Sequence, residues 1–380
     1  MGPLAGIRIL ELAGIGPLPM CAMLLADLGA TVLRIDRPDP QDLGVKRPIR
    51  ANLALRGRQA VALDLKRPEA RELVLRMVET ADCLLEGFRP GVTERLGLGP
   101  EACHARNPRL VYGRMTGWGQ AGPLAQAAGH DLNYIAVTGA LHAIGRAGQP
   151  PTPPLNLVGD FAGGSLYLAV GVLSALLEAR VSGRGQVVDA AIVDGTAHLM
   201  TGFHGLLAAG MMQEERGANL LDSGAYFYDC YACADGGWIS VAPIEGRFHA
   251  ELLRRLGIAA EDFPAQHDRA RWPEARARLA AVFRTRSRAE WCELLEGTDG
   301  CFAPVLTMEE SRRHPHMVAR GTYIEVEGVV QPGPAPRFSR TVPEAPTPPC
   351  EADPVHVAEA LSGWLAEEEI ATLSAAGTFG

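Results

Sequence analysis

The chain has 380 residues, a formal net charge of −8, 47% hydrophobic residues and 21% charged residues. This composition is ordinary for a globular protein with a large core, and the length favours two domains over one. The acidic balance argues against a general nucleic-acid surface, and no nucleic-acid-binding module is found.

Compartment and membrane association are predicted from the same composition. The longest apolar stretch, residues 166–177, is too short to cross a bilayer and reads as a buried helix. The first residues lack the basic start and apolar core of a signal peptide. Sparse cysteines, eight in all, then favour the cytoplasm. Cys230 and Cys233 form a C-x-x-C without a second pair or a nearby histidine, so we expect no metal site.

The first part of the chain alternates strand and helix patterns. The predicted strands are residues 7–12, 31–35, 60–63, 83–85 and 110–113, and the predicted helices include residues 20–28 and 68–80. This alternation is typical of βαβ units around a mainly parallel sheet. We therefore expect a large Rossmann-like α/β domain over residues 1–200, which also contains a buried helix at residues 163–179 and a strand at 186–192.

The pattern changes after about residue 220. A hairpin is predicted from residues 225–233 and 237–242, followed by short arginine-rich helices at residues 248–256, 274–283 and 288–295. Linker helices and a smaller α+β domain are thus expected over residues 201–330. Residues 331–354 are proline-rich and extended, and a helix is predicted at 355–369. The segment 331–380 is expected to return to the large domain.

A glycine turn follows the first predicted strand. Gly14 and Gly16 precede a helix, and Asp36 closes the next strand about 20 residues later, which resembles half of a dinucleotide-binding fingerprint. The third glycine of that fingerprint is missing, and Pro17 and Pro19 stiffen the turn that would wrap a pyrophosphate. A βαβ unit without a nicotinamide cofactor is the better interpretation.

Basic side chains gather near the ends of several predicted strands. Arg37, Lys66 and Arg89 each follow a strand, and Arg95 comes a few residues later. Each alone is typical of a solvated surface charge. Ligands of parallel α/β sheets bind at the carboxyl ends of the strands, and guanidinium groups match phosphate oxygens. Together these residues indicate a phosphate-rich ligand.

Two acid–base side chains, His130 and Asp160, lie beside glycines at the edges of predicted elements. The imidazole pKa of about 6.5 suits proton exchange near neutrality. Asp160 directly precedes the predicted buried helix, where an N-cap role would hold it ionised, whereas a general acid needs a raised pKa. A structural role stays open for each. Moving a proton between the two faces of a carbon needs two such groups, so a racemase or epimerase is the first hypothesis and an acyl transferase the second.

The chain resembles the α-methylacyl-CoA racemases of the family III CoA-transferase superfamily over nearly its whole length. The motifs that carry the resemblance are Leu12-Ala13-Gly14-Ile15-Gly16-Pro17, Arg34-Ile35-Asp36-Arg37-Pro38, Glu86-Gly87-Phe88-Arg89-Pro90-Gly91-Val92, Thr116-Gly117-Trp118-Gly119-Gln120, Gly129-His130-Asp131-Leu132-Asn133-Tyr134, Val158-Gly159-Asp160 and Gly183-Arg184-Gly185-Gln186-Val187-Val188-Asp189.

This resemblance implies a CoA thioester substrate and no metal or redox cofactor. The residues it assigns to the nucleotide end of CoA are Arg37, Leu63, Asp64, Leu65 and Lys66, with Arg89 and Arg95 near the phosphates and Gly129 and Tyr134 also in the binding site. An interlocked homodimer is implied as well. In it Glu245, otherwise an ordinary surface glutamate after a predicted strand, would meet His130 across the interface and orient the imidazole.

The implied reaction is 1,1-proton transfer through an enolate, with His130 and Asp160 as the two acid–base groups and backbone N–H groups near Asp131 stabilising the enolate oxygen. In the transferases of the superfamily the residue matching Asp160 is a nucleophile, and the position of His130 separates the two activities. CoA transfer through Asp160 and a non-catalytic acyl-CoA-binding protein are the alternatives. Met211 and Met212 are candidates for an apolar acyl surface.

Overall fold

A computed structural model describes residues 2–39 and 45–379. The chain divides into two compact units: the first comprises Met1–Thr138, Leu155–Leu199 and Gly321–Gly380, and the second Gly139–Pro154 and Met200–Arg320. Residues 139–154, assigned to the large domain from sequence, belong to the second unit. They are held there because Arg216 donates to the carbonyls of His142 and Gln149, and Arg146 pairs with Asp229.

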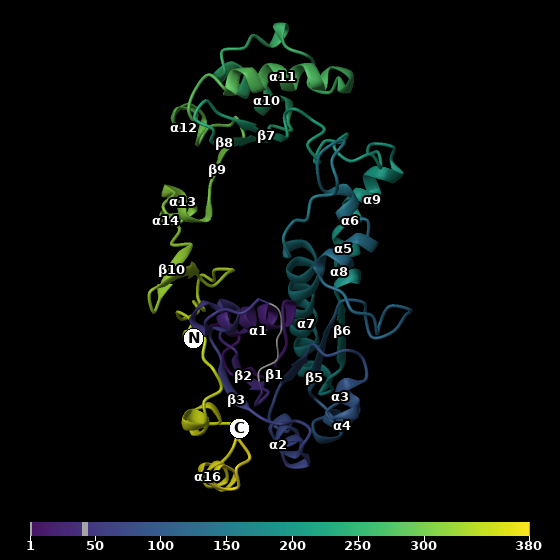
Figure 1. The fold of residues 1–380 in the computed structure, drawn as a ribbon, viewed down its shortest axis with the longest axis vertical. Coiled ribbons are helices and arrows are strands. Elements are labelled where there is room, and N and C mark those ends of the chain that lie inside the picture. The colour runs from purple at the N-terminus through teal and green to yellow at the C-terminus, as the bar shows by residue number, and fades with distance from the viewer. Residues whose placement is uncertain (1, 40–44, 380) are drawn as a thin grey trace. The chain divides into compact units, whose positions relative to one another are not determined.

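The first unit is built around a six-stranded sheet in which every strand pairs with its neighbours in parallel. Its strands are β1 (Arg8–Leu12), β2 (Thr31–Asp36), β3 (Gln59–Ala62), β4 (Cys83–Glu86), β5 (Val111–Thr116) and β6 (Val187–Ala191), in the order β3-β2-β1-β4-β5-β6 (Figure 1). The prediction of an α/β fold with a parallel sheet is confirmed. The strand order reverses between β1 and β4, which is where ligands bind in such sheets.

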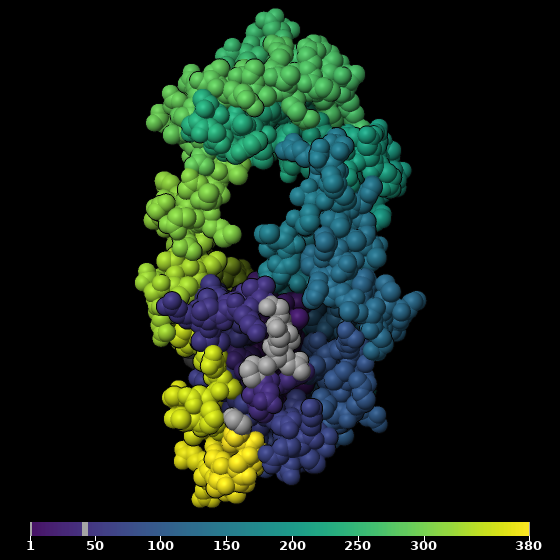
Figure 2. All heavy atoms as spheres, in the orientation of Figure 1, coloured from purple at the N-terminus to yellow at the C-terminus, as the bar shows by residue number. Residues whose placement is uncertain are grey.

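Helices cover both faces of this sheet because successive strand residues point to opposite sides. On one face, α1 (Pro17–Asp27) and α7 (Tyr167–Ser182) pack against Ile9, Leu85 and Val111. On the other, Leu10, Leu12 and their neighbours are covered by α2 (Pro68–Val78), α4 (Pro100–Arg106), α15 (Val357–Ala360) and α16 (Glu367–Ala375). In Figure 2 the C-terminal atoms, in yellow, border the purple N-terminal atoms of the same unit.

The C-terminal elements differ from their predictions. The hairpin β10 (Tyr323–Val326) and β11 (Val329–Pro332) was not predicted. The single helix predicted at 355–369 is wrong: a 3₁₀ turn (Pro354–His356) leads into α15, and Gly363, with a φ of 77°, lies before α16 begins at Glu367. A left-handed residue ends a helix, and glycine takes that conformation without steric cost. The unit also contains α3 (Val92–Arg95), α5 (Asp131–Val137), α8 (Ile192–Leu199) and 3₁₀ turns at Ile49–Ala51 and Leu53–Leu55.

The buried helix starts earlier than predicted. A π-helix (Leu157–Leu166) continues directly into α7, so Asp160 lies inside the first turn and is not the N-cap residue. The whole helix, Leu157–Ser182, has 26 residues and is long and apolar enough to cross a membrane. The core helix of a globular protein can have the same length and composition. In its apolar 18-residue stretch 44% is buried, and Leu168, Val172 and Ala175 lie in the core beside the sheet.

The second unit has a three-stranded antiparallel sheet and several helices. The sheet has the order β7-β8-β9, with β7 (Asp229–Ala232), β8 (Trp238–Val241) and β9 (Phe302–Val305). The helices are α6 (Ala140–Ala143), α9 (Thr201–Ala208), α10 (Gly246–Arg255), α11 (Trp272–Phe283), α12 (Arg288–Leu295), α13 (Met308–Ser311) and α14 (Pro315–Ala319), with 3₁₀ turns at Ala260–Asp262 and Arg269–Arg271. The first hairpin strand, predicted from residue 225, begins only at Asp229, because Tyr226 and Phe227 pack in the core before the ladder starts.

The contact between the π-helix and α8 should be intolerant of a side chain. A methyl group on Gly195 of α8 would overlap the carbonyl oxygen of Gly163. Overpacking of this kind costs about 1–3 kcal/mol, and we expect Gly195→Ala to lower stability by that amount in urea unfolding. The matched control is Gly202→Ala in α9, where nothing lies within 4 Å of the added methyl. It should be neutral or stabilise by up to about 1 kcal/mol; equal losses for the two variants would contradict this packing constraint.

Candidate active site

The loops that follow the parallel strands meet at the carboxyl edge of the sheet. The loop after β1 contains Gly16, which has a φ of 61°. A Cβ built on Gly16 would lie 3.2 Å from Oδ2 of Asp160, so the turn and the carboxyl are in direct contact. This places Asp160 beside the point where the strand order reverses, the expected ligand position for this topology.

His130 occupies the N-cap position of α5. Its backbone N–H donates to Oδ1 of Asn133 at 3.1 Å, and the Tyr134 hydroxyl donates to the carbonyl of the preceding Gly129. The Tyr134 ring packs edge-to-face on Trp118, with ring centroids 4.8 Å apart. The backbone on both sides of His130 is therefore fixed, while the imidazole itself is exposed.

Asp160 is held by backbone and side-chain contacts from three segments. Its backbone N–H donates to Oδ2 of Asp131 at 2.6 Å, and its Oδ2 accepts from the side-chain amide of Asn156 at 3.3 Å. Ser165 donates to both the Asp160 carbonyl and the Pro17 carbonyl, which ties the π-helix to the start of α1. The carboxyl is half-buried, and its position does not depend on a flexible loop.

The surroundings of Asp160 favour its protonated form. Burial raises the pKa of Asp160 above its ordinary value; the hydrogen bond from Asn156 lowers it, the negative charge of Asp131 raises it and His130 lowers it. Burial and a like charge are the usual causes of a raised carboxyl pKa. His130 is therefore close enough to Asp160 to affect its pKa. The pKa of Tyr134 is raised as well, by burial first and then by Asp160.

The predicted arginines lie at the same edge of the sheet and are exposed. The guanidinium of Arg37, after β2, lies 5.5 Å from the ring centroid of Phe88, after β4. Arg89 is near enough to Tyr134 to oppose the rise of the tyrosine pKa. Arg95, at the end of α3, reaches back toward Gly91. Cations from several loops thus gather around the carboxyl ends of the strands.

The residues after β3 differ in which of their groups a ligand could reach. Leu63 is fully buried in the core, so its side chain is unavailable and only its backbone can face a ligand. Asp64 accepts the backbone N–H of Lys66 at 3.0 Å, which shapes a tight turn, while the Lys66 side chain is exposed. Leu65 is partly buried against the same core.

Glu245 lies in the second unit, as the residue before α10. It is exposed within that unit, and its expected pairing with His130 stays a prediction. Asn156 and Trp118 were not assigned roles from sequence. The spacing of Asn156 and Asp160 would have indicated their contact only if the helix had been predicted to begin at Leu157.

The carboxyl of Asp160 rests against Gly16, in the turn that half matches the dinucleotide-binding fingerprint. Within residues 2–39 and 45–379 no three His, Cys, Asp or Glu side chains gather where they could hold a metal ion.

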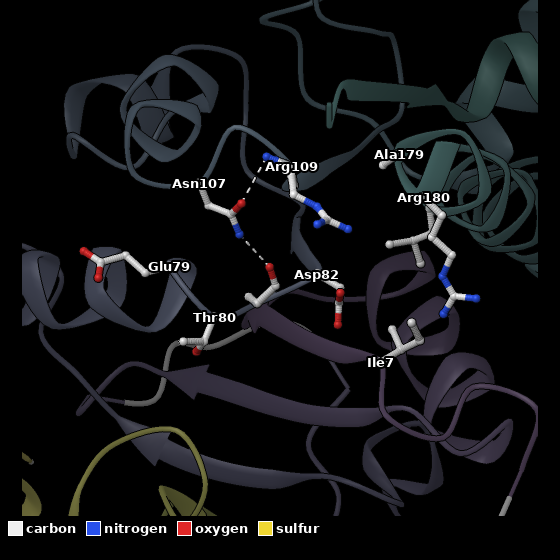
Figure 3. A pocket seen from close by; sticks show the side chains of 10 residues that line it. Ile7, Glu79, Thr80, Asp82, Asn107, Arg109, Ala179 and Arg180 are labelled. Atoms are coloured by element: carbon white, nitrogen blue, oxygen red, sulfur yellow. Dashed lines mark hydrogen bonds between the residues drawn. The ribbon is translucent and has the colours of Figure 1, made fainter. Parts of the chain in front are cut away.

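A separate pocket of about 230 Å³ lies at the opposite, amino ends of the strands (Figure 3). Residues that line it include Ile7, Asp82, Asn107, Arg109 and Arg180. Asn107 is tied to backbone groups, accepting from Arg109 N–H and donating to the Ala81 carbonyl. Because ligands of parallel sheets bind at the carboxyl ends, we assign the chemistry to the Asp160 edge and not to this pocket.

Comparison with known proteins identifies the family of the chain. The model of the family described as CoA-transferase family III matches residues 4–356. Mouse alpha-methylacyl-CoA racemase is 44% identical, covering 97% of this chain and 96% of its own, and the human alpha-methylacyl-CoA racemase is 43% identical, covering 89% and 87%. The crystal structure of a CAIB/BAIF family protein from Brucella suis superposes with a TM-score of 0.81 at 27% identity, covering 96% of this chain and 100% of that one. The resemblance seen in the sequence motifs is confirmed, and the chain belongs to the family III CoA-transferases.

Proposed function

We propose that the protein interconverts the (R) and (S) epimers of 2-methylacyl-CoA thioesters, as an isomerase. Identity of 43–44% to two alpha-methylacyl-CoA racemases supports this activity. The observation that carries it is the raised pKa of Asp160 in the neighbourhood of His130. A carboxyl with a raised pKa holds its proton more readily than an ordinary aspartate, and an imidazole can accept a proton, so the two groups suit the acid and base roles of epimerisation.

In this mechanism the α-proton leaves one face of the carbon and a different proton arrives at the other. Neutral His130 takes the α-proton, the electron pair of the C–H bond moves into the thioester as an enolate, and protonated Asp160 gives its proton to the opposite face. The enzyme is left with protonated His130 and ionised Asp160, which is the form that processes the other epimer. Positioned acid–base groups of this kind contribute about 10²–10⁴ in rate.

The enolate oxygen requires stabilisation from the protein. The first-turn N–H groups of α5, those of Asp131 and Leu132, have no carbonyl partner in the geometry of a helix start. They point out of the helix N-terminus next to His130 and carry the positive end of the helix dipole. We assign them to the enolate oxygen, where preorganised donors are most effective.

The CoA part of the substrate is assigned to the basic edge of the sheet. Arg37, Arg89 and Arg95 offer guanidinium groups to the phosphates, and the Leu63–Lys66 turn offers backbone groups and one ammonium. Proton transfer needs no cofactor other than the CoA already in the substrate. The cysteines of the described chain are free thiols, which suits a reducing compartment such as the cytoplasm.

CoA transfer is the second candidate, because the family as a whole is described as CoA-transferases. It would use ionised Asp160 as the nucleophile. A raised pKa lowers the ionised fraction of Asp160 at a given pH, and the ionised carboxyl is the form that acts as a nucleophile.

The two-base assignment predicts the behaviour of two variants. His130→Ala and Asp160→Asn should each lower the rate of conversion between the two epimers by at least about 10², since each removes one positioned group, while CoA affinity stays within about twofold. Conversion of each pure epimer is followed on a panel of 2-methylacyl-CoA thioesters. Normal racemisation by either variant would refute the assignment. Trapping of an acyl-enzyme anhydride with hydroxylamine would favour CoA transfer instead.

The phosphate assignment predicts a loss of CoA affinity. Replacing Arg37 or Arg89 by Ala removes a charge-assisted hydrogen bond worth about 1.5–3 kcal/mol, or roughly ten- to a hundredfold in Kd. Calorimetric titration with CoA at two salt concentrations should show the loss and its weakening at high salt. Arg109→Ala, in the pocket at the other end of the strands, is the matched control and should bind CoA normally. Equal losses in all three variants would contradict a phosphate site at the carboxyl edge.

A homodimer is the assembly we propose. Apolar side chains of α7 are exposed on the first unit, with exposed fractions of 63% for Val170, 65% for Leu177 and 90% for Val181. Contiguous exposed apolar surface marks an interaction site. In the interlocked arrangement, Glu245 of one subunit would orient His130 of the other.

Charge placed on this helix should therefore dissociate the protein and inactivate it. Val181→Glu is expected to shift sedimentation from dimer to monomer and to lower racemisation together with dimer content. Val355→Glu is the matched control, because Val355 is also exposed, at 83%, but lies outside α7. A wild-type protein that sediments as a monomer at full activity would rule out the shared site.

A further inference from the structure

The carboxylate of Asp131 is buried and only partly hydrogen-bonded, although the residue lies at the start of a helix. It is 5% exposed and is the first residue of α5. Its Oδ2 accepts the Asp160 backbone N–H at 2.6 Å, and its Oδ1 has no hydrogen-bond partner among the described residues. Burying a carboxylate costs free energy unless the group is hydrogen-bonded. The hydrogen bond to Asp160 is therefore the contact that stabilises Asp131 in this position.

The contact depends on the form of the π-helix. The first N–H groups of any helix have no carbonyl partner within the helix. Here the Phe161 N–H reaches the Asn156 carbonyl, and the Asp160 N–H is satisfied by Asp131 instead. A Cβ on Gly159 would lie 2.6 Å from Oδ2 of Asp131. The carboxylate therefore rests directly on the helix backbone and cannot turn away without losing this bond.

We propose that Asp131 is a positioning residue for Asp160: its buried carboxylate holds the Asp160 backbone N–H and places a negative charge beside the π-helix start, where it opposes ionisation of the Asp160 carboxyl. This inference rests on the proposed racemisation, in which Asp160 is one of the two acid–base groups. It goes further, because Asp131 touches no reacting atom through its side chain and acts only through Asp160.

The electrostatics of the pair agree with this role. Two neighbouring carboxylates resist ionising together, which raises the pKa of the one that keeps the proton. After burial, Asp131 is the group that raises the pKa of Asp160, against the lowering effects of Asn156 and His130. The other titratable side chains on elements packed against the π-helix are Cys21 and Asp27 of α1, Tyr134 of α5, Tyr167, Glu178 and Arg180 of α7, Asp194 and His198 of α8, Tyr112 and Arg114 of β5, and Asp189 of β6. None of them is among the causes of the Asp160 shift.

The pair also accounts for proton balance over a turnover. When Asp160 gives its proton to the α-carbon, both carboxylates are negative and protonated His130 carries the compensating positive charge. When the other epimer reacts, Asp160 takes the α-proton and the pair returns to one charge. In the proposed mechanism one exchangeable proton is either on His130 or on Asp160. The negative charge of Asp131 raises the fraction of enzyme that has it on Asp160.

The decisive experiment is Asp131→Asn, which keeps an oxygen acceptor for the Asp160 N–H and removes only the charge. Loss of a neighbouring negative charge lowers the pKa of Asp160. Because Asp160 has to be protonated to act as the acid, the alkaline limb of the kcat/KM profile should move to lower pH by roughly one unit. At neutral pH the protonated fraction of Asp160 falls, and kcat/KM should drop about three- to tenfold. The drop in kcat/KM must be the same for both epimers, because a change in the enzyme cannot alter the equilibrium constant between its two substrates.

The control is Asp194→Asn, which removes a carboxylate from the first turn of α8, another element packed on the π-helix. It should leave the pH profile in place. An Asp131→Asn variant that folds, as judged by circular dichroism and CoA binding, with an unshifted profile would show that Asp131 is merely structural. Loss of activity in Asp160→Asn alongside such a result would leave the two-base mechanism standing and overturn only the role of Asp131.

A measurement on the unaltered protein keeps the inference testable if Asp131→Asn does not fold. Aspartate labelled with ¹³C at the carboxyl carbon is titrated by NMR, with the Asp160 signal assigned from its absence in Asp160→Asn. The expected titration of Asp160 lies above the ordinary aspartate value of about 3.9. A midpoint at or below that value would overturn the proposal.

Discussion

The arrangement at the carboxyl edge depends on how closely the π-helix approaches its neighbours. Gly159, Gly163 and Gly164 leave this helix without side chains where it meets other elements. A Cβ on Gly164 would lie 3.0 Å from Ile192 of α8, one on Gly159 would lie 2.6 Å from Asp131 of α5, and one on Gly163 would overlap Thr196. Interiors are close-packed and have little room to relax. The backbone of Asp160 is therefore fixed by α5 and α8, and only at this spacing can the carboxylate of Asp131 reach its N–H.

This packing resolves the conflict between the position of Asp160 and its chemistry. An aspartate at the N-cap accepts backbone N–H bonds from the first turn, and those bonds stabilise the anion. Asp160 is not at the N-cap; that position is held by Asn156, whose side-chain amide donates to Asp160. The one hydrogen bond described for the Asp160 carboxyl, from Asn156, is long at 3.3 Å, and the backbone N–H of Asp160 binds Asp131 instead. Burial then outweighs the stabilisation of the anion, and the pKa of Asp160 rises.

The sheet could be predicted from sequence, whereas the detail around Asp160 could not. Buried parallel strands read as continuous apolar runs between helical patterns, which is why strands such as Thr31–Asp36 and Cys83–Glu86 were located within a residue or two. The π-helix was missed because Gly159, Gly163 and Gly164 are typical of a turn, and only tertiary packing makes a helix of them. Tyr226 and Phe227 were predicted to lie in a strand, but their side chains pack in the core of the second unit before the strand begins. The contact between Asp131 and Asp160 joins residues 29 positions apart, so local patterns carry no sign of it.

Asp160 has a different role in each of the two proposed reactions, so its neighbours decide which role it can fill. A nucleophile has to be ionised when the thioester arrives, whereas an acid has to be protonated. Asp131 and burial move Asp160 toward the second condition. In the proposed mechanism His130 is the base, and Asp131 directly follows it in the chain, so the start of α5 would provide both the base and the negative charge that favours protonated Asp160. Racemisation is in this view a property of the α5 start acting on a shared aspartate, and not of the aspartate itself.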